Sequence, residues 1–203
     1  MKKIFQSLVA VIGSFLSAAL MGPQITRRRT ADVAFPYRMS SGFPGDVNRF
    51  HPASILPGLA NTTNPPAAYG GPVIVNTADS TIRGIIAADG SATPGPVFGF
   101  LVRPFPIQQQ SGGMAAAIGT ATPPTTGVID VLREGYVMAK LPAGSTVTKY
   151  GTVYVWAAVS AGNHVQGQLE PSANGTNTLT INNAYFLGPA DANGNVEIEI
   201  RAA

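Results

Sequence analysis

Cysteine is absent from this sequence of 203 residues, and histidine occurs only twice, as His51 and His164. The lack of cysteine excludes disulfide bonds, thiolate metal sites and a cysteine nucleophile. The two histidines have no ligand-like spacing, so we expect each to be a surface or turn residue rather than a metal ligand. The sequence also has no phosphate-binding loop and no nucleophile elbow. These absences argue against an enzyme and against a bound cofactor.

Charged residues are scarce, at 11% of the sequence, whereas hydrophobic residues make up 45%. A surface with few charges is rich in neutral polar and apolar atoms, which is costly for a free monomer and useful in a packed assembly. Five of the 13 basic residues and none of the 10 acidic ones lie in residues 1–30. The rest of the chain has 8 basic and 10 acidic residues. A nucleic-acid-binding face is therefore not expected.

Glycine and proline are abundant, with 23 and 17 residues, and they separate short runs of β-type residues. This pattern predicts a mainly β fold for a body over residues 73–203, sandwich or barrel-like, with no helix of ordinary length after residue 22. Turns are expected at Asp89-Gly90, Glu134-Gly135, Asn174-Gly175 and Asn193-Gly194. The predicted strands are 73–75, 82–86, 97–102, 128–132, 136–141, 147–159, 179–181, 184–187 and 196–200.

The last predicted strand alternates between apolar and charged residues. Its apolar members are Val196, Ile198 and Ile200, and its charged members are Glu197, Glu199 and Arg201. Alternation of this kind is typical of a strand with one face on the core and one face in water. We therefore expect an exposed, edge-like strand at the end of the chain, which could form an interface.

Two groups of polar residues could carry chemistry. Asp130 and Glu134 could form a glycosidase-like carboxylate pair, but pairs this close in sequence are common by chance. Asp191, Asn193 and Asn195 loosely resemble a calcium-binding loop, although the twelve-residue pattern is incomplete. Asparagine–glycine turn chemistry explains these three residues better. Neither group indicates a catalytic or metal site.

Residues 1–30 read as an assembly arm that begins with an apolar helix and continues into a basic linker. A thin stripe of polar or small residues recurs every three or four positions, and large apolar residues surround it. A helix that is apolar around most of its circumference needs partners, and Gly22-Pro23 ends it. The candidate interface residues on this helix are Ile4, Phe5, Leu8, Val11, Ile12, Phe15 and Leu16.

The same N-terminal segment supports other interpretations. Lys2 and Lys3 followed by an apolar run and the small residues Ser17-Ala18-Ala19 match a cleavable secretory signal. A helix lying on a membrane surface is a third interpretation. Arg27, Arg28 and Arg29 form either a solvated linker or a clamp on an acidic protein surface or phosphate.

Residues 31–72 are rich in proline, with seven prolines between Pro36 and Pro72. Regular helix is not expected there because proline removes backbone donors and restricts the residue before it. We expect an extended arm that lies over a surface, since long loops in compact domains tend to be functional. Its candidate anchors are Phe35, Tyr37, Phe43, Phe50, Ile55 and Leu59.

Five stretches in the body and its approach, taken in order, resemble a known family. They are residues 43–49 (FPGDVNR), 97–106 (VFGFLVRPFP), 127–136 (GVIDVLREGY), 151–155 (GTVYV) and 188–197 (GPADANGNVE). Together they resemble the cement, or decoration, proteins of tailed bacteriophage heads, over roughly residues 42–201. None of them is a catalytic signature. The apolar arm at residues 1–21 departs from the family pattern, and it raises the question of whether the chain also builds a further assembly.

The resemblance implies a β-rich virion protein without enzymatic activity. Such proteins bind the outer surface of the capsid as dimers or trimers and tie neighbouring major capsid subunits together against the pressure of the packaged DNA. The implied partners are thus the major capsid protein and further copies of the chain, with no small-molecule substrate. The implied location is the exterior of the virion, reached from the host cytoplasm during assembly.

Two alternatives to a cement protein remain open from the sequence. A secreted bacterial β-sandwich, such as an adhesin or a cell-envelope binding module, would use residues 1–19 as a cleaved signal peptide. An enzyme such as a glycan hydrolase would need a pair of carboxylates in a cleft, and no feature of the sequence indicates one.

Overall fold

The computed structural model describes residues 42–49, 53–91, 97–104 and 122–201. The predicted N-terminal helix lies outside this range. Within it the fold is mainly β, as predicted, and the helical segments are two short 3-10 turns, η2 (Ala87–Ser91) and η3 (Gly175–Asn177). None of the described segments is a helix long and apolar enough to cross a membrane.

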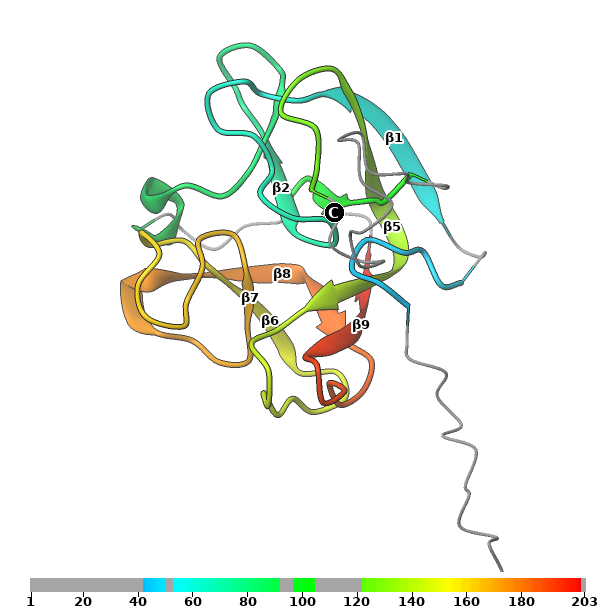
Figure 1. Cartoon of the computed structure of the whole chain (residues 1–203), viewed down its shortest axis with the longest axis vertical. Helices are drawn as coiled ribbons and strands as arrows, with labels where there is room; N and C mark the ends of the chain where they lie inside the picture. The colour runs from blue at the N-terminus through cyan, green and yellow to red at the C-terminus, as the bar shows by residue number, and fades with distance from the viewer. Residues whose placement is uncertain (1–41, 50–52, 92–96, 105–121, 202–203) are drawn as a thin grey trace, which may run out of the picture. The chain divides into compact units, whose positions relative to one another are not determined.

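The described strands form one curled antiparallel sheet in the order β3-β2-β4-β5-β9-β8-β6-β7, with β1 paired to β5 (Figure 1). All the strand pairs of this sheet are antiparallel. The strands are β1 (Ser54–Leu59), β2 (Pro72–Val75), β3 (Ile82–Arg83), β4 (Gly99–Leu101), β5 (Val128–Lys140), β6 (Thr152–Trp156), β7 (Leu169–Glu170), β8 (Thr178–Phe186) and β9 (Asn195–Ile200).

Strand β5 is the spine of the sheet. Its first half pairs with β1 and β4, and its second half, from Gly135 onward, pairs with β9. The predicted turn at Glu134-Gly135 is therefore wrong, because one strand of 13 residues runs through it. Gly135 has a φ of 128°, a conformation that glycine adopts without steric cost. The glycine thus lets β5 change partners without ending.

The first half of β5 belongs to a small ring of strands in the order β1-β5-β4-β2-β3. A parallel bridge between Ala60 and Ile82 completes the ring, and the Asn61 N–H donates to the Ile82 carbonyl at 2.8 Å. Gly58 permits this closure, since a Cβ there would lie 2.6 Å from Cγ1 of Ile82. The buried residues inside the ring are Ala60, Tyr69, Val73, Ile82, Leu101, Ile129 and Val131.

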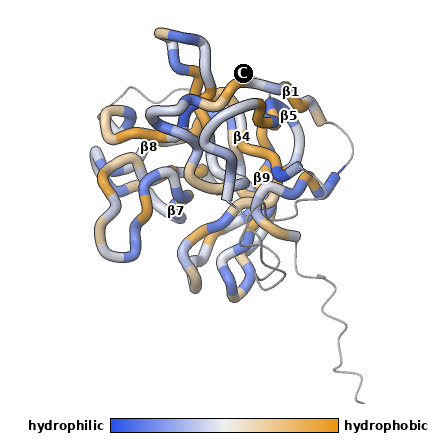
Figure 2. Tube along the Cα trace, turned by 45° about the horizontal axis from the view of Figure 1, so that its top comes forward, coloured by the Kyte–Doolittle hydropathy of each residue, from blue (hydrophilic) through white to orange (hydrophobic). Residues whose placement is uncertain are grey.

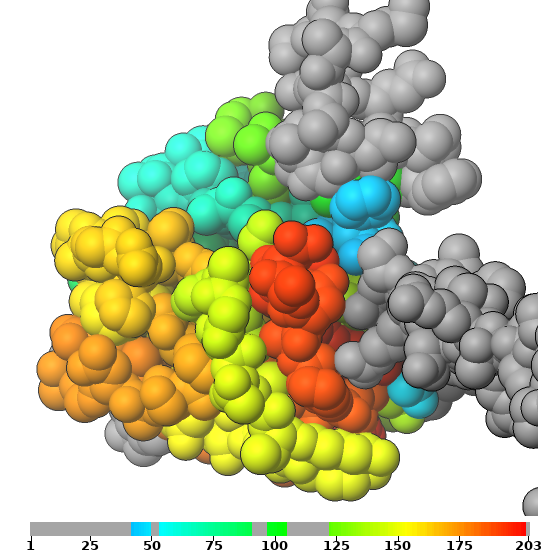
Figure 3. Space-filling model, turned by 60° about the horizontal axis from the view of Figure 1, so that its bottom comes forward, coloured from blue at the N-terminus to red at the C-terminus, as the bar shows by residue number. Residues whose placement is uncertain are grey.

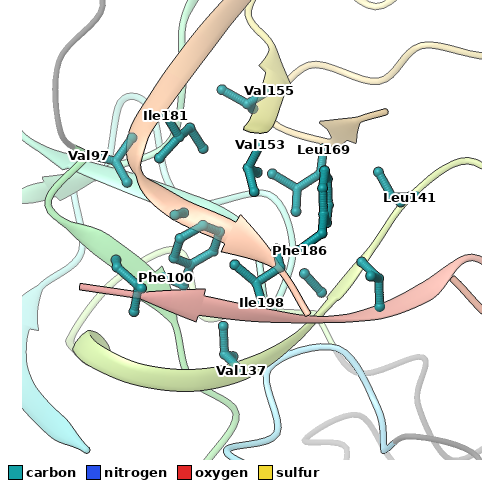
Figure 4. Packing of buried hydrophobic residues seen from close by; sticks show 14 of the residues in the cluster. Val97, Phe100, Val137, Leu141, Val153, Val155, Leu169, Ile181, Phe186 and Ile198 are labelled. Atoms are coloured by element: carbon teal, nitrogen blue, oxygen red, sulfur yellow. The ribbon is translucent and has the colours of Figure 1, made fainter. Parts of the chain in front are cut away.

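A larger core lies on the other side of β4 and β5. Phe100 and Leu132 are opposite each other in register and belong to this core, whereas their neighbours Leu101 and Val131 face the ring. The alternation along the two strands thus places a core on each face. Figure 4 shows side chains from β4, β5, β6, β7, β8 and β9 pointing toward one another in the larger core. The residues labelled from these strands are Phe100, Val137, Val153, Val155, Leu169, Ile181, Phe186 and Ile198, and Val97 just before β4 and Leu141 just after β5 are labelled with them.

The C-terminal strand is not the exposed edge that its sequence predicts. Strand β9 lies between β5 and β8, so both of its edges are paired. The alternation itself is confirmed, because Val196, Ile198 and Ile200 are buried and the residues between them are half-buried. Alternation reports how the two faces of a strand differ, but it carries no information about the edges.

Two further predictions concern β8. It runs from Thr178 to Phe186 as one strand, whereas two short strands were expected. Its partner β6 is opposite Ile181 at Val153 but opposite Tyr185 at Thr152, so β8 bulges between these positions. The polar residues Asn182 and Asn183, which lie between the two predicted strands, fall in this bulge. The predicted Asn174-Gly175 turn leads into η3 rather than joining two paired strands.

The predicted turn at Asn193-Gly194 is present before β9. The carboxylate of Asp191 accepts hydrogen bonds from the backbone N–H groups of Asn193 and Asn195, at 2.9 and 2.8 Å, and from the Asn195 amide. Gly194 has a φ of 84°, and a Cβ there would overlap the Leu141 carbonyl. The turn interpretation of these residues is therefore confirmed.

Replacing Gly135 by alanine should destabilise the fold by about 1–3 kcal/mol, because the strand must hold a backbone conformation that only glycine adopts readily. Gly144→Ala is the matched control: Gly144 also has a positive φ, of 77°, but lies in an open turn, where an added Cβ would meet no atom within 4 Å. We expect a smaller loss there, about 1 kcal/mol. Urea unfolding of both variants measures the difference, and equal losses would argue against a special role for the β5 bend.

The Asp191 turn should give the protein an acid-sensitive component of stability. Burial raises the pKa of Asp191, but the hydrogen bonds from Asn195 and Asn193 outweigh it, so the pKa lies below its ordinary value. A depressed folded-state pKa stabilises the fold above the unfolded-state pKa, and this contribution is lost as the pH falls through the folded-state pKa. Asp191→Asn should therefore lose less stability than the wild type between neutral and acid pH in urea titrations. Parallel pH profiles would contradict this assignment.

Candidate assembly surface

Among the aromatic residues and the arginines predicted as interface candidates, Phe43 is the one that falls within the described range. Its side chain is 41% exposed. The other candidates lie outside the described residues and keep the status of predictions. They are Ile4, Phe5, Leu8, Val11, Ile12, Phe15, Leu16, Arg27, Arg28, Arg29, Phe35, Tyr37 and Phe50.

The segment 42–49 is attached to β5 by its backbone. The Gly45 N–H donates to the Met138 carbonyl at 2.8 Å, and the Met138 N–H donates to the Asp46 carbonyl at 2.9 Å. Gly45 has a φ of 92°, and a Cβ there would lie 2.7 Å from Cβ of Tyr69. A glycine is thus required for the segment to approach this closely.

Arg103 fixes the same segment through its side chain. Its guanidinium lies 5.4 Å from the centre of the Phe43 ring and 5.5 Å from that of Tyr69, and its Nε donates to the Pro44 carbonyl at 3.2 Å. Cation–π contacts contribute roughly 0.5–1 kcal/mol at exposed sites and about 2 kcal/mol when desolvated, and the Arg103 side chain is only 10% exposed. Burial raises the pKa of Tyr69, and the positive charge of Arg103 offsets part of that rise. Phe43 is therefore held in a defined position with much of its ring in water.

Arg49 ties the end of the segment to β9. Its guanidinium makes two hydrogen bonds to the Glu197 carboxylate, at 2.9 and 2.8 Å, and lies 4.6 Å from the centre of the Tyr136 ring. The hydrogen bonds to Glu197 raise the pKa of Arg49 above its ordinary value. Figure 3 shows the segment in blue against the red C-terminal strand. Glu197, on the charged face of β9, thus already has an ion-pair partner within the protein.

Strand β1 presents an apolar surface to solvent. Gly58 is half-buried, and the other five residues of the strand are exposed. Ile55, Leu56 and Leu59 are 43, 44 and 59% exposed, and Val128, which is opposite Leu59 on β5, is 66% exposed. By strand alternation, Ile55 and Leu59 share the outer face. Figure 2 shows the hydropathy of β1 beside that of β5.

The loop 157–168 is a second exposed apolar feature. Val159 is 73% exposed and Val165 is 50% exposed. These are branched side chains with little freedom to fold back onto the protein. The loop follows β6 and precedes β7, at the end of the strand order.

Trp156 contacts this loop at two points. The indole ring stacks on the His164 imidazole with centroids 4.2 Å apart and planes inclined by 12°, and Nε1 donates to the Val159 carbonyl at 3.3 Å. The Nδ1 atom of His164 lies 2.8 Å from a carboxylate oxygen of Glu170, which is buried. Gln166 donates to the Ala157 carbonyl at 2.7 Å. The loop is thus preorganised rather than loosely extended.

Catalytic chemistry finds little support in the described part of the chain. No group of three or more histidine, cysteine or acidic residues is placed there to hold a metal ion. Two hollows on the described part of the chain are lined by neutral residues, the first by Pro65, Pro66 and their neighbours and the second by Thr146, Thr148 and theirs. His164 lies in a turn, as predicted, and His51 lies outside the described residues.

Sequence reasoning found part of this surface and missed the rest. Ile55 and Leu59 were expected to be anchors, although within an extended arm rather than in a strand of the sheet. The apolar run from Ile55 to Leu59 could have indicated a strand. Pro57 argued against one, because within sheets proline is found mainly in edge strands. The loop 157–168 was not predicted, because its first residues were expected to continue a strand over 147–159. Strand β6 instead ends at Trp156, which stacks on His164 eight positions further along the chain.

Comparisons with known proteins agree with the resemblance noted from the sequence. Residues 33–200 match the family described as XM1 gp53 minor capsid protein. A search of curated proteins finds no match. A chain in the solved structure described as the capsid of Myoviridae Phage XM1 superposes with a TM-score of 0.51 at 17% sequence identity, covering 77% of this chain and 88% of that one. At this identity the likeness shows a shared fold.

The family match spans nearly all of the described residues and includes the five stretches that carried the resemblance. The predicted resemblance to a bacteriophage capsid-associated protein is therefore confirmed, and the chain belongs to the family of XM1 gp53 minor capsid proteins, which are structural proteins of the phage capsid.

Proposed function

We propose that this protein is a capsid cement: it binds the outer surface of the phage head and ties neighbouring major capsid subunits together, without enzymatic activity. The observation that carries the proposal is the preorganised loop 157–168, which displays Val159 and Val165 to solvent. Family membership supplies the setting in which such a surface meets a partner, namely the capsid.

The physical case rests on preorganisation. Burying apolar surface contributes roughly 25 cal/mol per Å², but association also costs the ordering of loops and side chains. The contacts of Trp156 with His164 and with the Val159 carbonyl hold the loop before binding, so less of this cost remains when a partner docks. Phe43, held by Arg103, offers a further ordered apolar contact.

The N-terminal arm adds reach to these contacts in our proposal. The apolar residues at 4–16, the arginines at 27–29 and the aromatic residues Phe35, Tyr37 and Phe50 would contact a neighbouring capsid subunit or another copy of the chain. Dimers or trimers of the protein on a symmetric shell would multiply weak contacts through high effective concentration. The protein would assemble from the host cytoplasm and remain on the virion exterior.

Placing a negative charge on each loop valine should weaken attachment to heads. We expect the double variant Val159→Asp/Val165→Asp to fold normally, since both side chains are exposed, and to bind purified heads at least tenfold more weakly, because two carboxylates must be desolvated at the contact. Ala143→Asp, in the exposed turn after β5, is the control for added charge. Co-sedimentation with heads that lack the protein measures binding; wild-type binding by the double variant would refute the role of the loop.

Deleting residues 2–21 should leave the β fold intact but weaken attachment or self-association, because the apolar segment supplies buried area only in an assembly. Circular dichroism checks folding, and occupancy on particles together with sedimentation velocity checks assembly. Unchanged occupancy and an unchanged oligomer would contradict the arm hypothesis. Mass spectrometry of particles purified from the native source is a further check, since a soluble chain beginning near Leu20 would instead support a secreted binding module.

A further inference from the structure

The outer edge of β1 is unpaired over residues 54–57 within the part of the chain that the structure describes. One edge of β1 pairs with β5, and no strand in the described part of the chain pairs with the other edge over these residues. Exposed sheet edges are usually protected by charged residues, bulges or proline. Residues 53–60 contain no charged side chain, and the protective features among them are Pro57 and the register shift between Ser54 and Ile55.

The backbone groups on this free edge can be assigned. The Ala60 N–H donates to the Gly127 carbonyl on the β5 side, so by alternation Gly58 and Leu56 also face β5, whereas Ile55 and Pro57 face outward. The partner strand supports this assignment. Asp130, which is opposite Pro57 in register, directs its carbonyl to β4, where it accepts a hydrogen bond from the Val102 N–H. The free edge therefore offers a donor and an acceptor at Ile55 and an acceptor alone at Pro57.

These groups are complementary to themselves under a two-fold axis. If Ile55 of one copy lies opposite Ile55 of a second, antiparallel copy, the two residues exchange two hydrogen bonds. Each Pro57 then lies opposite residue 53 of the other copy, and its missing N–H leaves the carbonyl of residue 53 without a donor there. Shifting the register so that Ile55 lies opposite Pro57 leaves each Ile55 carbonyl without a donor. The missing N–H of Pro57 thus disfavours the register that places Ile55 opposite Pro57.

The side chains favour the same partner. Ile55, Pro57 and Leu59 lie on the outer face of β1 by alternation, next to Val128, and a two-fold axis at Ile55 would bring two such apolar rows together. Since residues 53–60 carry no charge, two copies meet without like-charge repulsion. A partner strand of another protein would gain no comparable match from symmetry.

We propose that two copies of this chain associate through the outer edges of β1, antiparallel and centred on Ile55. This interface goes beyond the proposed cement function and does not depend on which capsid protein is bound. A six-residue edge buries less than the roughly 1,200 Å² typical of stable interfaces. The contact is therefore weak in dilute solution and is reinforced where copies are held close together on a particle.

The test uses the full-length protein without capsids. Because the chain has no cysteine, Ile55→Cys introduces a single thiol, and paired strands place opposite Cα atoms about 5.5 Å apart, within disulfide range. Mild oxidation should convert Ile55→Cys to a covalent dimer at least tenfold faster than Val159→Cys, an exposed control in the loop 157–168. Equal rates would overturn the proposal.

A second variant checks the interface without a cross-link. Ile55→Lys places like charges opposite each other and should weaken self-association at least tenfold in sedimentation equilibrium, whereas Val165→Lys should not change it. Unchanged self-association of Ile55→Lys would overturn the proposal. So would a loss of head binding by Ile55→Lys without a loss of self-association, because the edge would then receive a capsid strand. Head binding by the wild type reports separately on the cement function.

Discussion

The continuity of β5 through both parts of the sheet is the constraint on which the rest of the structure depends. Its first half completes the ring of β1 to β5, and its second half begins the sheet of β9, β8, β6 and β7. Because Leu132 faces the larger core and Val131 faces the ring, neither core can form without this strand. A single glycine, Gly135, allows the two halves to differ in direction and partner.

The approach of the N-terminal arm is defined by a few strong contacts rather than by a strand. Backbone hydrogen bonds join Gly45 and Asp46 to Met138, and two arginines, Arg49 and Arg103, stack on aromatic rings while bonding to acceptors. An arginine used in this way combines a directional hydrogen bond with a flat apolar contact. The segment 42–49 is therefore held at a defined place on the sheet.

Much of the β pattern could be predicted from the sequence, but its pairing could not. Strands were correctly predicted in runs such as 97–102 and 196–200, because glycine and proline mark the ends of these apolar runs. Edges are different: the central position of β9 depends on β5 and β8, which are distant in sequence. The turn expected at Glu134-Gly135 failed because glycine serves both turns and bent strands. Strand β1 was not predicted because Pro57 argued against a strand. The order of the loop 157–168 was not predicted because it depends on the stacking of Trp156 on His164, which no local pattern indicates.

The two exposed apolar features lie on different parts of the sheet, which suits a tether. Strand β1 is paired to the first half of β5, whereas the loop 157–168 adjoins β6 and β7 at the far end of the strand order. In the cement function proposed above, the protein would carry load between separate contacts. Here the load would pass through continuous backbone hydrogen bonds and a close-packed core, which deform little. The scarcity of charge fits the same purpose, since apolar contacts lose little strength when salt screens electrostatic attraction.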